Sequence, residues 1–326
     1  MLSFEHCTEY PGALKTLELP IPGKLQGKVR DIWDLDGTRL IVSTDRQSAF
    51  DIVLGTVPRK GEVNTQLAAW WFERSADIIP NHIIDLPDPQ VMRVRRARVW
   101  PVEMIIRGFI TGVTSTALWY NYAQGQRRIY GLDFPDGLQK NQRLPEAVIT
   151  PTTKAESGQH DEKLTREQIL ELGLVPEAIY RRMEAATRAL FARGQQLAAE
   201  RGLILVDTKY EFGDVDGELV LIDEIHTFDS SRFWKLDSYA ERFAAGEEPD
   251  TFDKEFLRRW YVEQGYRGDG PPPPMPPELA ERMSGLYISV YEQLTGETFV
   301  PAEPELSAPA RIEKNLRAAG IIAGGG

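Results

Sequence analysis

Apolar and polar residues alternate along much of the first hundred positions, as they do on β-strands. Two such runs, Lys28–Trp33 and Thr38–Ser43, flank the dipeptide Asp36-Gly37, which favours a hairpin turn. Two more runs follow at Val91–Val99 and Val102–Ile106. Arginines interrupt the run Val91–Val99, but their spacing is that of a strand with one face in water. The pattern predicts a β-rich N-terminal region.

Apolar residues three or four positions apart predict helices elsewhere. The predicted helix Thr165–Gly173 starts with a capping box, and Pro176–Gly202 starts at a proline and ends at a glycine. The predicted helices are Asn64–Ser75, Thr165–Gly173, Pro176–Gly202, Asp253–Gln264 and Glu278–Leu294. The residues beyond Pro301, which end in a run of glycines, are expected to form a mobile tail.

Charged residues occupy two runs that otherwise have the apolar composition of a sheet core. Leu203–Gly213 and Glu218–His226 are predicted to form a hairpin. Because side chains alternate along a strand, Asp207, Lys209 and Glu211 share one face. Burying several charges there is unfavourable unless a cation or ligand compensates them. A lysine between two carboxylates suits a nucleotide phosphate and its Mg²⁺; a hairpin with its charges in water is the alternative.

The turn of this hairpin can be built in two ways, which place different acids beside Lys209. A three-residue loop ending at Gly217 would put Asp223 opposite Lys209. A two-residue type I′ turn, Asp216-Gly217, would put Glu224 there instead, with Asp223 pointing away. Either register leaves three acids and one lysine on one face.

The composition is that of a globular protein from a reducing compartment. The 326 residues are 42% hydrophobic and 27% charged, and the length suggests two domains. A net charge of −11 argues against a nucleic-acid partner, which would favour a basic surface. The single cysteine excludes an intrachain disulfide, the N-terminus has no signal-peptide pattern, and no apolar run reaches the ~20 residues of a membrane span. We therefore expect a cytoplasmic protein.

Several common signatures are missing from the sequence. It has no Walker A loop, no G-x-G-x-x-G, no nucleophile elbow and no zinc-type spacing of Cys and His. The four histidines are scattered, and only His160, beside Asp161 in a polar loop with a glycine, has a setting that suggests function.

Polar segments on predicted strand edges and loops carry the remaining candidate chemistry. Lys28 and Arg30 are two apart and share a face, so their strand can lie over a polyphosphate. Arg107 and Arg232 can each bind a carboxylate or phosphate through two hydrogen bonds. Together the segments indicate an ATP site beside a second, anionic substrate. They are Gly27–Asp31, Ser43–Asp51, Arg107–Gly112, Thr150–Asp161 and Asp229–Trp234.

In this order, from about residue 27 to about residue 295, these segments resemble the SAICAR synthetase family, most closely its longer, yeast-like members. The motifs that carry the resemblance are Gly27-Lys-Val-Arg-Asp31, Thr44-Asp-Arg46, Ile106-Arg-Gly108, Thr153-Lys-Ala-Glu156, His160-Asp-Glu162, Asp207–Gly213 and Asp229–Trp234. The resemblance implies an α+β fold of two lobes with mainly antiparallel sheets, loosely like a protein kinase or an ATP-grasp enzyme, plus C-terminal helices. ATP would lie between the lobes. We expect an ATP-binding lobe at residues 1–102, a substrate and Mg/ATP-binding lobe with the helical extension at 103–300, and a tail at 301–326.

The reaction that the resemblance implies is the ligation of L-aspartate to the carboxylate of the nucleotide CAIR, giving SAICAR, ADP and phosphate in de novo purine biosynthesis. The protein would be an ATP-dependent acid–amino-acid ligase that uses ATP and Mg²⁺, with CAIR and L-aspartate as its small-molecule substrates. Phosphoryl transfer depends on positioning and charge neutralisation, which explains why no nucleophilic side chain stands out. Yeast-type length favours a monomer, or a small homo-oligomer.

The same resemblance implies a role for each candidate residue. ATP phosphates would be bound by Lys28 and Arg30, and phosphate and Mg²⁺ by Lys209, Glu211 and Asp223. The metal ligands would be Glu211 and Asp223, an assignment that favours the three-residue loop. CAIR would be bound by Arg107, Asp229, Ser231 and Arg232. The residues assigned to catalysis are Lys154, Asp161, Asp207 and Lys209. Lys154 and Asp161 would lie beside the CAIR carboxylate and the incoming aspartate, with Thr153 and His160 also binding substrate.

One position departs from the family pattern. Many members have Gly-Ser where this chain has Gly112-Val113, and valine cannot donate the serine's hydrogen bond to a substrate phosphate. Thr114 or Ser115 would replace it. Two alternative functions are a kinase-like phosphotransferase and a non-catalytic nucleotide-binding module. The first would need His-Arg-Asp-like and Asp-Phe-Gly elements, which are absent, and the second would have no use for the polar loop Thr150–Asp161.

Overall fold

The computed structural model describes residues 4, 6–50, 52–154, 162–252, 255–268, 270–303 and 305–323. The chain forms two compact units. Unit 1 is assembled from Met1–Trp71, His82–Arg96 and Asp253–Gly326, and unit 2 from Phe72–Asn81 and Ala97–Phe252. None of the helices in the described ranges is both long enough and apolar enough to cross a membrane.

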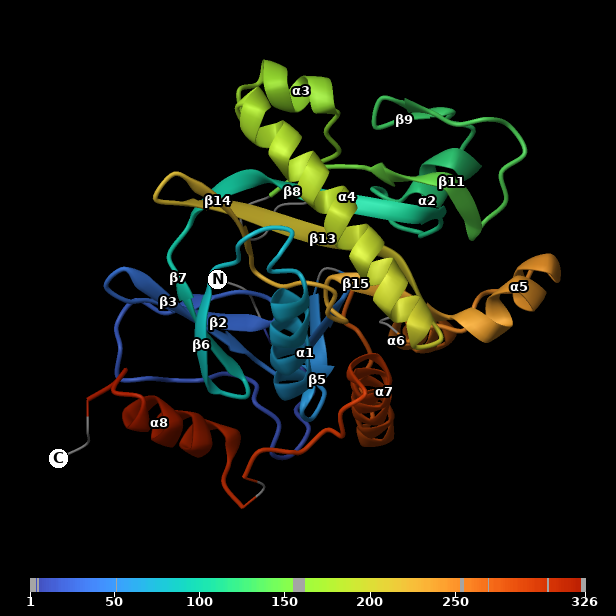
Figure 1. Ribbon diagram of the computed structural model, residues 1–326. Helices are drawn as coiled ribbons and strands as arrows, with labels where there is room; N and C mark the ends of the chain where they lie inside the picture. Colours follow the sequence, from blue (N-terminus) through green and yellow to red (C-terminus); the bar gives the residue numbers. More distant parts are fainter. Residues whose placement is uncertain are drawn as a thin grey trace. The chain divides into compact units, whose positions relative to one another are not determined.

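Unit 1 contains a five-stranded antiparallel sheet in the order β1-β2-β3-β7-β6 (Figure 1). The strands are β1 (Leu25–Gln26), β2 (Arg30–Asp34), β3 (Thr38–Ser43), β6 (Ile83–Asp88) and β7 (Val91–Arg95). The predicted hairpin at Asp36-Gly37 is confirmed, since β2 and β3 pair up to Asp34 and Arg39 on either side of it. A second, separate hairpin joins β4 (Arg46–Ala49) to β5 (Ile52–Thr56).

The helices assigned to unit 1 come from both ends of the chain. They are α1 (Lys60–Arg74), whose last three residues belong to unit 2, α6 (Glu255–Glu263), α7 (Pro277–Thr295) and α8 (Ala308–Ala318). Helices were predicted for the first three at nearly these bounds, and those predictions are confirmed. In α7, proline stands at the first helical position and Gly296 ends the helix in the left-handed conformation.

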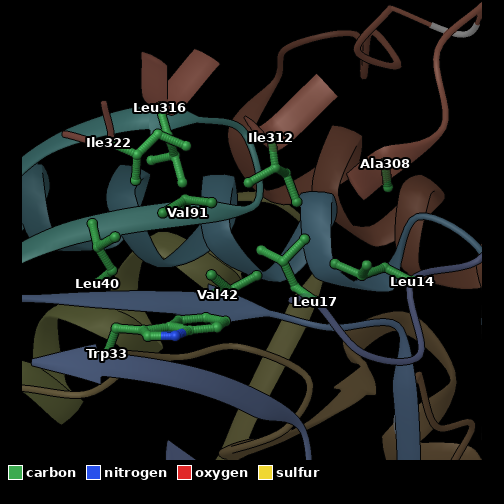
Figure 2. Close-up of a cluster of buried hydrophobic side chains, with 10 residues drawn as sticks. All are labelled: Leu14, Leu17, Trp33, Leu40, Val42, Val91, Ala308, Ile312, Leu316 and Ile322. Atoms are coloured by element: carbon green, nitrogen blue, oxygen red, sulfur yellow. The ribbon is translucent and has the colours of Figure 1, made fainter. Parts of the chain in front are cut away.

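The prediction of a mobile tail after Pro301 is wrong for α8. Ala308, Ile312 and Leu316 recur at four-residue spacing, so they form one apolar stripe of the helix. Figure 2 shows this stripe in a buried cluster with side chains of the sheet, among them Val91 and Val42. Burial of apolar area stabilises by roughly 25 cal/mol per Å². Docking on this core therefore orders α8, although the glycine-rich composition after it favours mobility.

Unit 2 contains a six-stranded antiparallel sheet organised around one long strand, β13 (Leu203–Val215). One edge of β13 pairs with β8 (Arg98–Ile110). The other edge is shared, with β15 (Ser231–Lys235) on its first half and β14 (Glu218–Ile222) on its second. The remaining strands, β11 (Gln142–Ile149) and β12 (Thr152–Thr153), pair with β8.

The helix α4 (Glu177–Glu200) lies along one face of this sheet (Figure 1). A Cβ added to its Gly194 would come within 2.7 Å of Leu205 and 2.4 Å of His226, so the helix approaches β13 closely only because glycine stands there. The other elements of unit 2 are α2 (Leu118–Ala123), β9 (Arg128–Ile129), β10 (Leu132–Asp133), α3 (Arg166–Glu171) and α5 (Leu236–Ala244). Helices α3 and α4 confirm two predictions, and the capping box of Thr165 with Gln168 is present.

The predicted domain boundaries at residues 102 and 300 do not match the units. The segment 72–81 belongs to unit 2, and the described residues after Phe252 belong to unit 1. The physical reason is that the C-terminal helices bury their apolar faces against the N-terminal core. Arg311 of α8, for example, bonds Glu62 at the start of α1. Pairings over such long sequence separations leave no trace in a local hydrophobic pattern.

Candidate active site

The predicted polar face of β13 exists, and two neighbouring strands extend it. On β8, Arg107 lies opposite Asp207 and Glu103 lies opposite Glu211. On the other side of Asp207, β15 contributes Arg232. Directly opposed residues of antiparallel strands share a face. Arginines and carboxylates from three strands therefore gather on one face of the sheet, with Lys209 between the two acids of β13.

The β13–β14 hairpin has the two-residue turn. Val215 pairs with Glu218, and Asp216 and Gly217 have φ of +54° and +86°. Both central residues of a type I′ turn need positive φ, which Asp-Gly tolerates, and the twist of this turn matches that of the strands. The three-residue loop that the resemblance favoured is therefore wrong.

The position of Asp223 also differs from the prediction. Pairing between β13 and β14 ends at Glu211 and Ile222, and Asp223 then leaves the strand with φ +70°. Strand alternation therefore assigns no face to Asp223 or to Glu224. Glu224 is buried and accepts a hydrogen bond from Thr227 in the same loop. A metal-binding role for Asp223 stays a prediction from the resemblance alone.

Lys209 lies between two carboxylates, but one of them is Glu103 rather than Asp207. The Nζ atom of Lys209 is 2.7 Å from Oε1 of Glu103 and 2.6 Å from Oε1 of Glu211. Lys154 donates a hydrogen bond to Oε2 of Glu211. Oγ1 of Thr152 lies 3.4 Å from Oε2 of Glu103. Two lysines thus balance two buried carboxylates, and we call these four charged residues the lysine cluster.

The protonation states within the lysine cluster follow from its charges. Burial by itself would lower the pKa of Lys209, but the carboxylates of Glu211 and Glu103 outweigh burial, and the pKa is raised. Burial would raise the pKa of Glu211, but Lys209 and Lys154 bring it well below the usual range. Lys209 is therefore a lasting cation and Glu211 a lasting anion near neutral pH. They act as fixed charges and not as exchangers of protons.

Glu103 is the site residue that the sequence analysis missed. It is the only charged residue within the apolar run Val102–Ile106, and it is 7% exposed. An isolated acid inside a buried strand was the available signal, because such a charge needs a partner. The partner, Lys209, stands 106 residues away in the sequence, and only the pairing of β8 with β13 reveals it.

A second group of ions lies on the same face, around Asp207, two residues before Lys209 on β13. Oδ2 of Asp207 is 3.6 Å from Nη1 of Arg107 and 3.6 Å from Nη1 of Arg232. This oxygen is buried and accepts no hydrogen bond. Arg107 is held by Thr150, whose Oγ1 is 2.8 Å from Nε, and by the carbonyl of Thr116 at 3.3 Å. The pair of guanidinium groups around one carboxylate has a net positive charge, which suits an anionic ligand.

The segment that departs from the family pattern follows β8 directly. Gly112 has φ +93°, and a Cβ there would lie 2.6 Å from Ala117 and 3.7 Å from the guanidinium of Arg232, so glycine is required. Val113 is 54% exposed, and Thr114 and Ser115 are exposed as well. Both residues thus lie in the segment between Gly112 and Thr116, whose carbonyl accepts from Arg107, and neither is preferred over the other by its position.

Ser231 is not brought together with the arginines. It pairs with Thr208, whereas its neighbour Arg232 pairs with Asp207, so the two side chains point to opposite faces of the sheet. The hydroxyls of Ser231 and Thr208 are 2.8 Å apart. Asp229 lies in the preceding loop, half-buried, with its amide 3.3 Å from Oγ1 of Thr227. The predicted contact of the Ser231 hydroxyl with substrate is therefore not favoured.

Lys28 and Arg30 belong to unit 1; Lys28 lies on the loop that leads into β2, and Arg30 is the first residue of that strand. All four carbonyls of Gly27–Arg30 are occupied by two residues of the Thr44-Asp-Arg46 motif. Arg46 donates to the carbonyls of residues 27, 28 and 30 at 2.9–3.0 Å, and Thr44 donates to that of Val29. Arg46 is fully buried and also bonds Asp31 at 2.9 Å. The motif is a backbone support that fixes the loop from which the two cations project.

His160 and Asp161 lie outside the described residues. Thr153 is described, and its hydroxyl accepts a hydrogen bond from the amide of Glu162 at 3.0 Å. Among the described residues, no three or more His, Cys, Asp or Glu side chains are grouped as metal ligands. Glu211 has the carboxylate oxygens that Mg²⁺ prefers, and proteins commonly supply one or two carboxylates and leave the other positions to phosphate and water. Both oxygens accept hydrogen bonds from lysines here, so binding Mg²⁺ through Glu211 would require Lys209 or Lys154 to give up its bond.

These features define an α+β protein in which arginines, lysines and carboxylates gather on one face of the sheet of unit 2. A family model described as SAICAR synthetase matches residues 24–273. The chain belongs to the SAICAR synthetase family. This finding confirms the family, the fold class and the ATP-dependent ligase predicted from the sequence.

Relatives match over nearly the whole chain. A putative phosphoribosylaminoimidazole-succinocarboxamide synthase 2 of Mesorhizobium japonicum is 48% identical over 298 residues, which cover 91% of this chain and 95% of the relative. The phosphoribosylaminoimidazole-succinocarboxamide synthase of Bacteroides thetaiotaomicron is 45% identical over 93% of this chain and 98% of its own.

Among solved structures, a SAICAR synthase from Saccharomyces cerevisiae complexed with SAICAR is similar, with a TM-score of 0.77 and 34% identity. The match covers 89% of this chain and all of the yeast chain. It supports the predicted likeness to yeast-type members.

Proposed function

We propose that this chain joins L-aspartate to the carboxylate of CAIR, with ATP split to ADP and phosphate. The observation that carries the proposal is the single polar face of β13, where the arginine pair around Asp207 and the lysine cluster stand next to each other. Successive side chains on one face of a strand are roughly 7 Å apart. One nucleotide substrate can therefore reach both groups of charges at once.

The chemistry needs fixed cations more than it needs a proton acceptor on the protein. An oxygen of the CAIR carboxylate attacks the terminal phosphorus of ATP, and ADP leaves. The amine of aspartate then attacks the acyl carbon, a C–N bond forms, and phosphate leaves with the carboxylate oxygen while the nitrogen loses a proton. Charge moves onto phosphate and acyl oxygens in both steps. Preorganised cations stabilise such charge without reorganising.

The arginine pair is the natural holder of CAIR. We assign the substrate's anionic groups to Arg107 and Arg232, with Asp207 keeping the two guanidinium groups apart and oriented. The hydroxyl of Thr114 or Ser115 would serve the phosphate in place of the usual serine. Asp229 would bind a polar group of the same substrate. Ser231 would act only indirectly, by fixing β15 to β13.

The lysine cluster would serve the reacting groups. Lys209 and Lys154 would neutralise charge on the transferred phosphoryl group and on the CAIR carboxylate, with Thr153, His160 and Asp161 nearby as the resemblance implies. Glu211, together with Asp223, would hold Mg²⁺, which when bound supplies charge neutralisation at the phosphates. Lys28 and Arg30 would bind ATP phosphates from the loop that Arg46 supports.

Phosphate release from Mg-ATP by the purified protein tests this function, with CAIR and L-aspartate added singly and together. We expect release and a SAICAR product only when both are present. Release that needs CAIR alone would support an acyl phosphate that water can hydrolyse. No release with any combination, while ATP still binds, would overturn the proposal in favour of a nucleotide-binding module.

Two further expectations stay predictions. We infer that the protein works in the cytoplasm, from its single cysteine and its metabolic substrates. A monomer or small homo-oligomer is expected, and a sedimentation measurement at working concentration checks it.

A further inference from the structure

A network of buried ions joins α8 to the sheet of unit 1. Arg311 is 2% exposed. Its Nη1 is 2.7 Å from Oε1 of Glu62, and its Nε is 3.1 Å from Oδ2 of Asp88. Its Nη2 is 2.5 Å from the side-chain oxygen of Gln90. Asn315, one turn later on α8, donates to the same carboxylate of Asp88 at 2.8 Å.

Gln90 links this network to the turn Thr44–Arg46. While its oxygen accepts from Arg311, its amide nitrogen lies 3.2 Å from the carbonyl of Ser43 and 3.5 Å from Oδ1 of Asp45. The amide of Ser43 donates to the backbone carbonyl of Gln90 at 2.9 Å. Gln90 is 1% exposed, so these bonds do not compete with bulk water.

Asp45 is the centre of the turn and has two further bonds. Oδ2 accepts from the amide of Leu14 at 2.7 Å, and Oδ1 accepts from the amide of Gly61 at 2.8 Å. A Cβ at Gly61 would lie 2.2 Å from the carbonyl of Ser43, so α1 begins in direct contact with the turn. The residues on either side of Asp45 are Thr44 and Arg46, which hold the carbonyls of Gly27–Arg30.

We propose that Arg311 positions the phosphate-binding loop Gly27–Arg30, acting through Gln90 and the Thr44–Arg46 turn. The proposal rests on the assignment of Lys28 and Arg30 to ATP phosphates. Arg311 touches no substrate in this scheme; it is a positioning residue. It lies beyond residues 24–273, the segment that the family model matches. In this proposal, α8 supports the loop of unit 1 that binds ATP phosphates.

The geometry favours positioning over simple docking of α8. The apolar stripe of Ala308, Ile312 and Leu316 already attaches the helix to the core. An arginine buried with two carboxylates adds little net stability compared with apolar residues of similar volume, because desolvation offsets the attraction. What such a buried network supplies is a unique arrangement of the groups that it bonds.

The test compares Gln90→Met with Lys314→Ala in the full-length protein. Gln90→Met keeps the side-chain length and the charge balance but removes the link between Arg311 and the turn. Lys314 lies on the same helix, exposed, with Glu303 as its partner at 2.7 Å, and serves as the matched control. The measurements are KM for ATP, KM for aspartate, kcat and the melting temperature.

We expect Gln90→Met to raise KM for ATP about tenfold, the factor that corresponds to about 1.4 kcal/mol. The KM for aspartate and kcat should change less than twofold. Amide hydrogen exchange at Gly27 and Thr44, which donate to Arg30 and Val29, should become faster in the same variant. Arg311→Lys keeps the charge without the planar fork and should show the same rise in KM for ATP.

An unchanged KM for ATP in Gln90→Met and Arg311→Lys, together with unchanged exchange at Gly27, would overturn the positioning role even if stability falls. A separate variant, Lys28→Ala, keeps the two proposals apart. If Lys28→Ala leaves KM for ATP unchanged, the phosphate assignment is wrong, and the exchange rates at Gly27 and Thr44 still decide whether Arg311 positions the loop.

Discussion

Both units bury arginines, but the two regions use them differently. In unit 1, Arg46 donates hydrogen bonds to carbonyls and to Asp31 at 2.5–3.0 Å, and Arg311 bonds two carboxylates and an amide. In unit 2, Arg107 and Arg232 approach Asp207 only to 3.6 Å, and the carboxylate oxygen between them accepts no hydrogen bond. Ions with this many hydrogen bonds maintain a structure. We propose that a ligand completes the bonding around the loosely paired carboxylate of Asp207.

The largest effect is expected at the lysine cluster. Lys209→Met removes a fixed cation from the reacting groups, and we expect kcat to fall by about 10³-fold or more, the magnitude of losing a preorganised electrostatic contact. Steady-state kinetics with Mg-ATP, CAIR and aspartate measures it. Arg181→Ala, in an exposed pair with Glu177 on α4, is the control and should keep normal kcat.

Lys24 is not a suitable control for Lys209. Its Nζ bonds the carbonyl of Leu17 at 2.7 Å and lies 3.2 Å from the carboxylate of Asp31. Substituting it would therefore disturb the support of the Gly27–Arg30 loop. Normal turnover in Lys209→Met would remove the role that we assign to this lysine.

The next effect is expected on stability in unit 1. Arg46→Met leaves Asp31 with Lys24 as its remaining cation and leaves the carbonyls of residues 15, 27, 28 and 30 without the donors of Arg46, so unfolding should become easier by about 3–5 kcal/mol. Urea unfolding followed by fluorescence measures the change. A loss below about 1 kcal/mol would contradict the view that this arginine is structural.

The corresponding substitution in unit 2, Arg107→Met, should affect substrate binding more than stability. Arg107→Met removes hydrogen bonds to Thr150 and Thr116 but leaves Asp207 with Arg232 as its partner, so the free energy of unfolding should fall by about 1–3 kcal/mol, less than for Arg46→Met. The KM for CAIR should rise roughly 10–100-fold, as for the loss of a charge-assisted bond to substrate. Equal losses of stability in Arg46→Met and Arg107→Met would abolish the distinction between the two regions.

The smallest effect is a pH dependence in unit 1. Burial raises the pKa of Asp45 to about 6 despite the amides of Gly61 and Leu14, whereas its ordinary value is 3.8. The folded state therefore binds this proton more tightly than the unfolded state, and the stability from Asp45 falls as pH rises towards 6. Between pH 5 and 6 the loss should be about 1 kcal/mol, and it is complete above the folded pKa.

NMR titration of the Asp45 carboxyl carbon measures this pKa directly. A midpoint near 6 is expected, and a midpoint near 3.8 would show that the two amides outweigh burial. Gly61→Ala is no useful variant here, because its Cβ would meet the carbonyl of Ser43.

Local pattern was enough for the elements and for one face of the site. The alternation along β13 placed Asp207, Lys209 and Glu211 together, and the capping box at Thr165 located the start of α3. The same local reasoning failed after Ile222, where a backbone turn at Asp223 ends the alternation. It also left Ser231 beside Arg232 in the predicted substrate site, although adjacent residues of a strand face opposite ways.

The sequence by itself determined the family, the class of reaction and the set of polar segments, because short motifs in a fixed order can be recognised without any knowledge of contacts. Tertiary structure decided which charges meet. Glu103 reaches Lys209 across 106 positions, and Arg311 reaches Glu62 across 249. The sequence shows only that a buried charge needs a partner. The pairing of strands and the docking of α8 determine which residue that partner is.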